Sequence, residues 1–376
     1  MYRSTKVLAI LSLGVISTVE AAPVVSSYSG TVGDGQQITI TGSGFGTTGP
    51  TVVLFDDFEK GGGAVGAAIP LTSPSVGSWT TYGQDRGRPR YSSFARSGTH
   101  GWRVSDSTQD LNKDDSNRIG QFLQVMGTSF SEAFISYAVG LPPNTTFPGS
   151  ATVGRFPNVS AFKMTWFYDG ATGFGADAKA DLCVPTFGGA FLIAGNDGNV
   201  VSQDEWFSGM GQDWFSFTKW TRISSWLHNG TSTGTYFQSV NEDKGYKEHN
   251  WAGRSPFPSG ASSKWDRMSM PGWWGNGDNT NNQATYDDVY LAIGPNAAAR
   301  VEIGDAATYS AAKKLAISTP VSWSNGSITA NLRMGPFKSS DTLYLFVIDA
   351  NNVPSAGIRL SECKDCPKPP TGAAAQ

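Results

Sequence analysis

Gln37-Ile-Thr-Ile-Thr-Gly-Ser-Gly-Phe-Gly46 alternates apolar and polar residues and then runs into closely spaced glycines. Ile38 and Ile40 would lie on one face of a strand and Thr39 and Thr41 on the other, because successive side chains of a strand point to opposite faces. The glycines after the strand, and those that precede it at 33–35, are typical of tight turns. This stretch therefore predicts a strand between two turns.

The rest of the chain has the same character. Its 376 residues include 45 glycines and 12 tryptophans, and only 16% of the residues are charged. This composition favours short strands joined by tight turns over helices. The one segment with helical character is 306–315. We therefore predict an all-β fold, with strand-like runs at 133–139, 160–168, 189–194, 220–227, 234–240 and 284–293.

The first 22 residues have the parts of a secretory signal: Arg3 and Lys6, an apolar run at 7–16, and small residues up to Ala22. The apolar run has ~10 residues, fewer than the ~20 that span a bilayer. We expect residues 1–22 to be cleaved and no membrane span elsewhere, with an uncleaved anchor helix as the alternative. The protein should be secreted to the medium, the cell surface or the periplasm.

The stretch from Pro23 to Gly46 resembles the opening of an IPT/TIG domain, an immunoglobulin-like sandwich with the pattern G-x-x-x-T-I-T-G-x-G-F-G. The later strands of that family are missing after it. They have counterparts near the other end of the chain, in Arg300-Val-Glu-Ile-Gly-Asp305, Val321-Ser-Trp-Ser324 and Asp341-Thr-Leu-Tyr-Leu345. An isolated hairpin is marginally stable, and domain termini often lie close together. We therefore expect 23–54 and 297–361 to pair as one split sandwich; two separate small modules are the alternative.

Residues 55–296 would then be an inserted domain. It opens with Phe55-Asp-Asp-Phe-Glu-Lys-Gly61, continues through Ser97-Gly-Thr-His-Gly-Trp102, and closes with Tyr286-Asp-Asp-Val-Tyr-Leu291. These segments resemble concanavalin A-like jelly rolls of the laminin-G and polysaccharide-lyase kind. The resemblance implies a two-sheet sandwich whose concave face binds sugar polymers. Residues 362–376 are expected to form a flexible tail.

Two neighbouring strand-like runs carry side chains suited to sugars. Rings stack on the apolar face of a pyranose, and amides and hydroxyls take its hydroxyl groups. Alternation places Arg222, Ser224, Trp226 and His228 on one face of the first run. The candidate glycan-binding residues are Trp226, His228, Tyr236 and Gln238. The alternative is that they form the half-buried outer face of an ordinary sandwich.

A second candidate lies in the Gly- and Asn-rich stretch 271–283. Trp273 and Trp274 are adjacent there and cannot both point into one core, so at least one is expected near the surface. An exposed ring on a loop indicates binding. Packing across the mouth of the sandwich is the competing interpretation.

Calcium is the one metal that the sequence favours. Hard oxygen ligands would come from the two ends of the inserted domain, at adjoining edges of a jelly roll. The candidate ligands are Asp56, Asp57, Glu59, Asp287 and Asp288, with Asp278 as a further donor. Their spacing matches no defined calcium loop, and solvated carboxylates or turn caps are the alternative. No cofactor is required by any motif.

The cysteines carry little chemistry. Cys363 and Cys366 could form a local disulfide in an exported protein, whereas Cys183 stands alone. A zinc site would need a second pair of ligands. A redox function is not expected, because the C-x-x-C lies in a Pro-rich tail.

Enzyme motifs are largely missing. The paired-carboxylate strand of jelly-roll glucanases, a nucleophile elbow, a P-loop and a dinucleotide fingerprint are all absent. β-Elimination needs a base and a group that neutralises a uronate carboxylate. Tyr236, His228, Arg222 and Gln238 could form that set.

The formal net charge of −3 gives no electrostatic case for nucleic acid. The leading hypothesis is a non-enzymatic protein that binds polysaccharide or a surface protein. The alternatives are a lyase acting on an acidic glycan and a structural subunit of an extracellular assembly that associates with itself.

Overall fold

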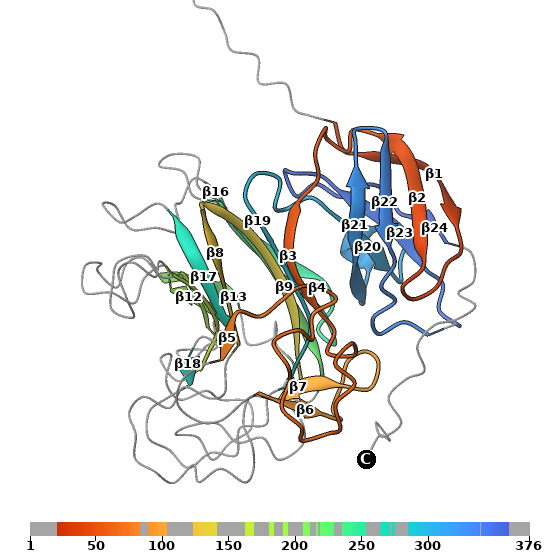
Figure 1. Cartoon of the computed structure of the whole chain (residues 1–376). Helices are drawn as coiled ribbons and strands as arrows, with labels where there is room; N and C mark the ends of the chain where they lie inside the picture. The colour runs from red at the N-terminus through yellow and green to blue at the C-terminus, as the bar shows by residue number, and fades with distance from the viewer. Residues whose placement is uncertain are drawn as a thin grey trace, which may run out of the picture.

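The computed structural model describes residues 21–82, 89–103, 123–140, 162–168, 180–183, 191–194, 206–210, 216, 219–228, 235–252, 264–270, 273–274, 285–338 and 340–360. The described chain consists of three antiparallel sheets, which confirms the all-β prediction. Two sheets stack as a sandwich, and the third lies beside it (Figure 1). Within the described ranges, no helix is long and apolar enough to cross a membrane.

The third sheet joins the two ends of the chain. Its strand order is β1-β2-β22-β21-β20-β23-β24, and β2 pairs with β22 in the register Gln37↔Asn331. Ile38 and Ile40 pack with Ile328 in its core, as the alternation predicted. We call this sheet and its turns the terminal module. Its strands are β1 (Val24–Gly30), β2 (Gln37–Ser43), β20 (Arg300–Gly304), β21 (Leu315–Trp323), β22 (Ser327–Asn331), β23 (Tyr344–Ile348) and β24 (Ile358–Arg359). Its identity as an IPT/TIG or immunoglobulin-like module stays a prediction.

The nine-stranded sheet of the sandwich lies next to the terminal module. Its order is β16-β15-β14-β9-β19-β3-β4, and β7 pairs with β19 and β6. The strands are β3 (Thr51–Asp56), β4 (Val76–Gly77), β6 (Arg90–Ser92), β7 (Gly101–Arg103), β9 (Glu132–Gly140), β14 (Thr221–His228), β15 (Thr235–Glu242), β16 (Lys247–Ala252) and β19 (Thr285–Ile293). The domain boundary expected between 54 and 55 falls inside β3.

The eight-stranded sheet forms the other layer. Its order is β13-β12-β11-β10-β17-β8-β5, with β18 paired to β10. The strands are β5 (Thr81–Tyr82), β8 (Leu123–Phe130), β10 (Phe162–Tyr168), β11 (Ala180–Cys183), β12 (Phe191–Ala194), β13 (Trp206–Met210), β17 (Trp265–Met270) and β18 (Trp273–Trp274). The strands expected from the sequence at 133–139, 160–168, 189–194, 220–227, 234–240 and 284–293 are thus confirmed as β9, β10, β12, β14, β15 and β19.

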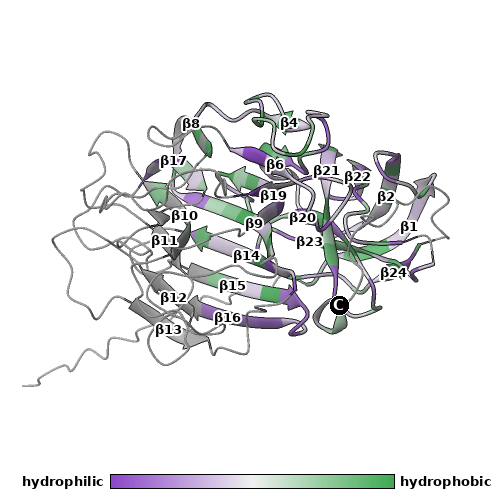
Figure 2. Ribbon diagram, turned by 90° about the horizontal axis from the view of Figure 1, so that it is seen from below, coloured by the Kyte–Doolittle hydropathy of each residue, from purple (hydrophilic) through white to green (hydrophobic). Residues whose placement is uncertain are grey.

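The main core fills the space between these two sheets. Ile223 and Leu227 of β14 belong to it, as do Met268 and Met270 of β17. Trp102 is fully buried there and stacks on Tyr286, with 5.0 Å between the ring centroids. Figure 2 shows the same layers from below, with β9, β14, β15 and β16 in sequence across one sheet.

The prediction of helical character at 306–315 is wrong. Only a 3-10 turn forms there, at Tyr309–Ala311. The carboxylate of Asp305 accepts the N–H groups of Lys313 and Lys314, at 2.8 and 3.2 Å, and Leu315 already begins β21. Hydrogen bonds of this kind offer the backbone an alternative to a helix.

Candidate functional site

The predicted glycan-binding residues divide between the two faces of the nine-stranded sheet. Residues directly opposite each other in an antiparallel pair share a face. Tyr236 is opposite Leu227, whose side chain is in the core, and Gln238 is opposite Ser225. Both positions therefore belong to the inner face, whereas Trp226 belongs to the outer face, and the four residues do not form one cluster.

Trp226 and His228 lie at the rim of the outer face. Their rings are stacked, 6.1 Å apart with 24° between the planes, and both are half-buried. Trp226 also packs against the apolar cluster that contains Phe134, its partner across β14 and β9, and donates from Nε1 to Glu132 Oε1 at 3.0 Å. Burial raises the pKa of Glu132 and outweighs this hydrogen bond, which lowers it. The ring thus joins the contact with the terminal module rather than an open sugar platform.

Arg222 is held in an ion pair between the modules. It is 4% exposed, and its Nη2 lies 3.2 Å from Glu302 Oε1 of β20. Glu302 also receives Arg300 Nε at 2.5 Å and the Tyr309 hydroxyl at 3.2 Å. Burial alone would raise the pKa of Glu302, but Arg222 and Arg300 bring it below its ordinary value. A lyase function for Arg222 gains no support, because its partner is already a protein carboxylate.

A second contact between the modules is made by Arg96, a residue that no pattern in the sequence indicated. Its guanidinium contacts the carboxylates of Glu242 and Asp288 and donates to the Leu315 carbonyl of β21 at 2.8 Å. Burial lowers the pKa of Arg96, but the two carboxylates raise it above its ordinary value, so the guanidinium stays charged. Glu242 and Asp288 have φ angles of 97° and 50°, which cost energy in residues other than glycine.

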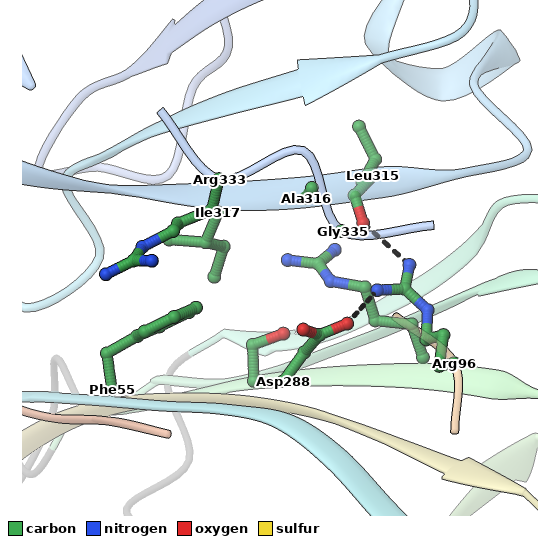
Figure 3. A pocket seen from close by; sticks show the side chains of 10 residues that line it. Phe55, Arg96, Asp288, Leu315, Ala316, Ile317, Arg333 and Gly335 are labelled. Carbon is green, nitrogen blue, oxygen red and sulfur yellow. Dashed lines mark hydrogen bonds and ion pairs between the residues drawn. The ribbon is translucent and has the colours of Figure 1, made fainter. Parts of the chain in front are cut away.

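A small cavity lies between the modules beside this tie (Figure 3). Phe55 and Asp288 line it from the nine-stranded sheet, and Leu315, Ile317 and Arg333 line it from the terminal module. Its volume is about 10 Å³, which is room for about one water molecule. As it stands, the cavity admits water but no sugar.

The residues predicted to bind calcium do not gather into a metal site. In the described part of the chain, no group of three or more His, Cys, Asp or Glu side chains could hold a metal ion. Asp56 is fully buried and accepts hydrogen bonds from Phe58 N, Ser73 Oγ and Trp79 Nε1, at 2.8, 2.5 and 2.7 Å. Asp57 faces Arg333, whose Nη1 is 3.6 Å away.

The other predicted calcium ligands are also occupied by protein donors. Asp287 is buried and accepts three backbone N–H groups, those of Arg96, Ser97 and Asp288, at 2.7–3.0 Å. Glu59 accepts the backbone N–H groups of Thr99 and His100, at 2.7 and 2.6 Å. These carboxylates clamp loops to strands, so the donor set does not fit a calcium ion as arranged here.

Several predicted features fall wholly or partly outside the described residues. Residues 1–20 of the predicted signal segment 1–22 lie outside them, as do Asp278, Cys363 and Cys366. Trp273 and Trp274 form β18, which pairs with Phe162 and Lys163 of β10. The backbone there is a short strand at a sheet position rather than the loop that the sequence favoured.

The register assigns a different set of positions to the outer side of the eight-stranded sheet. Phe167 and Met268 are opposite each other and point into the core, so the positions on either side of them lie on the outer face. One row of paired positions crosses seven strands: Trp206, Ala194, Asp181, Trp166, Ser269, Gln124 and Thr81. Next to it, Arg267 is opposite Tyr168, and its side chain is 33% exposed. The terminal module lies on the opposite side of the sandwich (Figure 1).

No protein-family model matches the chain. No curated protein matches it either. Solved structures do show similarity. Alginate lyase vAL-1 from Chlorella virus matches with a TM-score of 0.39 and 13% identity, over 65% of this chain and 100% of that one.

Two lectins are similar as well. Lectin I from Ulex europaeus, in complex with the methyl glycoside of α-L-fucose, has a TM-score of 0.35 and 10% identity over 65% of this chain and 97% of its own. Peanut lectin with a 9mer peptide has a TM-score of 0.30 and 9% identity over 56% and 90%. These comparisons thus report a distant similarity to lectins and to an alginate lyase. At these scores no residue assignment is carried over.

Proposed function

We propose that this protein is a secreted polysaccharide-binding protein and that the outer face of the eight-stranded sheet contacts the glycan. The observation that carries the proposal is the difference between the two outer faces of the sandwich. The nine-stranded sheet is covered by the terminal module, whereas the eight-stranded sheet has Trp166, Trp206 and Tyr168 at outer positions among polar ones. Rings beside amides, hydroxyls and charged groups are the combination that binds sugars.

The test is retention of the mature protein in native gels that contain neutral or acidic polysaccharides. Trp166→Ala and Arg267→Ala should each weaken retention by tenfold or more, about 1.4 kcal/mol or greater. The matched control is Lys219→Ala, which removes an exposed cation paired with Asp243 at 2.9 Å on the other side of the sandwich. Retention that both Trp166→Ala and Arg267→Ala leave unchanged would place the binding face elsewhere. Failure of the unaltered protein to bind any polymer would contradict the proposal and favour an assembly subunit.

A lyase is the second candidate, and one observation favours it. Tyr236 and Gln238 share the inner face of the nine-stranded sheet, and His249 is opposite Gln238 on the same face. A phenol, an imidazole and an amide are the groups that β-elimination from a uronate requires. The same incubations should therefore be followed for the ultraviolet absorbance of unsaturated uronate ends. Absorbance that disappears in Tyr236→Phe would make the protein a lyase.

A further inference from the structure

The face that the terminal module covers carries buried polar side chains beside an apolar cluster of Phe55, Phe134, Tyr290 and Ala292. Ser136, Ser224 and Arg222 line β9 and β14 there, each at most 4% exposed, and Ser224 Oγ donates to Ser136 Oγ at 3.0 Å. Stability alone does not explain buried ion pairs in this contact, because replacing such pairs by packed apolar groups is often neutral or stabilising. The apolar contacts of the terminal module come from Ile317, which lies in the cluster of Phe55 and Phe134, and from Tyr309, whose ring centroid is 5.5 Å from that of Tyr246.

The two members of the ion pair between the modules differ in how many other partners they have. Glu302 keeps Arg300 and Tyr309 as partners within its own module. Arg222 has one hydrogen-bonding partner among the described residues, which is Glu302 itself. If the modules separated, Glu302 would stay neutralised and Arg222 would present an uncompensated charge. A ligand carboxylate could take the position on Arg222 that Glu302 now holds.

The connections between the modules allow such a separation. The two linkers, 44–50 and 294–299, lie side by side, and Asn296 Nδ2 donates to Thr48 Oγ1 at 2.8 Å. Gly44, Gly46, Gly294 and Asn296 all have φ angles between 68° and 84°. Hinges are a few loop residues that absorb changes in φ and ψ.

The Arg96 tie closes the other end of the contact. Arg300 begins β20 directly after the linker, and Gly304 at its far end pairs with Leu315, which accepts from Arg96. Arg300 and Gly304 are four residues apart along β20, so the Arg96 contact lies about 13 Å from the end of β20 that follows the linker. Separation would remove from Arg96 only the Leu315 carbonyl, because Asp288 and Glu242 both belong to the sandwich side. The water-sized cavity beside it shows that the contact is incompletely packed.

From these observations we propose that the terminal module is a hinged cover and that the face of β9 and β14 beneath it binds an oligosaccharide with carboxylate groups. Glu302 holds the position of a ligand carboxylate on Arg222 until the ligand displaces it. Ser136 and Ser224 then meet sugar hydroxyls, and the half-buried ring of Trp226 stacks on a pyranose. Trp226 is four residues from Arg222 along β14, about 13 Å, so the ligand must exceed one sugar ring.

This face is separate from the outer face of the eight-stranded sheet, so the two proposals can fail independently. Because the binding-competent state is a minor one, the apparent affinity is lowered by the fraction of molecules that are open. The unaltered protein should therefore bind weakly. A variant that loosens the cover should bind more tightly.

The experiment is hydrogen exchange measured by mass spectrometry on the full mature chain, with a galacturonate trimer, galacturonic acid and a neutral galactose trimer. The acidic trimer should speed exchange in β20 and at the start of β21 and slow it in β14, while β1 and β2 stay unchanged. The monomer and the neutral trimer should have no effect. Arg222→Gln should remove the response, and the control Lys219→Gln should keep it.

Glu302→Gln is the decisive second variant, and it should raise the affinity for the acidic trimer about tenfold or more. If it does not fold, the comparison of the unaltered protein with Arg222→Gln still decides. No exchange response in the unaltered protein, or an equal response in Arg222→Gln, overturns the proposal. So does a folded Glu302→Gln that binds the trimer no better.

Discussion

β14 is buried on both sides, yet its two faces meet different neighbours. Ile223 and Leu227 face the eight-stranded sheet in an apolar core, whereas Arg222, Ser224 and Trp226 face the terminal module among charges. The first face is stabilised by the hydrophobic effect, which is not directional. The stability of the second face depends on the pairing of specific charged groups. Two buried faces of one strand can therefore serve stability and specificity separately.

The largest effect should come from the apolar face. Trp102→Ala removes a fully buried ring stacked on Tyr286 and should lower the free energy of unfolding by about 4 kcal/mol. Trp226→Ala removes a half-buried ring on the other face and should cost about 2 kcal/mol. Chemical denaturation of both variants measures the difference. Equal losses would mean that the two faces contribute alike.

The charged face should respond asymmetrically to loss of one partner. Glu302→Ala leaves both Arg222 and Arg300 buried without their carboxylate and should cost about 3–5 kcal/mol. Arg222→Met leaves Glu302 paired with Arg300 and should cost about 1–2 kcal/mol. The midpoints of urea unfolding test this order. The reverse order would show that Arg300 does not neutralise Glu302.

The pH dependence separates the faces further. On the apolar side, burial raises the pKa of Asp56 to about 6 and outweighs its hydrogen bonds to Ser73 and Trp79. Between the ordinary pKa of 3.8 and this value, the folded protein holds a proton that the unfolded chain has released. Stability should therefore fall as the pH rises from about 4 to above 6, by about 3 kcal/mol for this group. The pKa of Asp287 is also raised, by burial, and adds to the same trend.

Unfolding midpoints at a series of pH values measure this trend, and Asp56→Asn should make the curve flatter. Asparagine keeps one oxygen for Ser73 and Trp79 but turns its amide toward Phe58 N–H, so the variant loses some stability at every pH. An unchanged slope in Asp56→Asn would show that another group titrates.

The smallest effect should come from chelation of calcium. The carboxylates proposed as ligands already accept protein N–H and O–H groups, so EDTA should shift the thermal midpoint by less than about 1 °C, which corresponds to a few tenths of a kcal/mol. Differential scanning fluorimetry with EDTA and with added calcium tests this. A clear rise with calcium would restore the metal hypothesis.

The sequence predicted the strands well because their signal is local. Ile38 and Ile40 alternate with threonines, and the structure has them in the core of the terminal module. Alternation also placed Arg222, Ser224 and Trp226 on one face. The covering of that face was not predictable, because it depends on Glu302, 80 residues later in the chain and in another sheet.

The predicted glycan-binding residues lie on two faces of the sheet for a similar reason. A strand pattern shows which residues of one strand share a face, but it does not give the register with the next strand. The pairing of Leu227 with Tyr236 decides that the tyrosine position is on the inner face. Arg96 was missed because it lies in a short loop between β6 and β7 without any periodic pattern. Its two partners come from separate strands, Glu242 from β15 and Asp288 from β19.

The pairing of β2 with β22 also bears on how the protein is made. Gln37 and Asn331, which face each other across this pair, are 294 residues apart in the sequence. The first hairpin must wait without its partner until the chain has been synthesised past residue 331, and contacts this distant slow folding. The sandwich can collapse first, while the terminal strands stay open to chaperones or to wrong partners. Completion of the terminal module would then follow the collapse of the sandwich, and proteolysis during folding should remove the first hairpin before it cuts the sandwich.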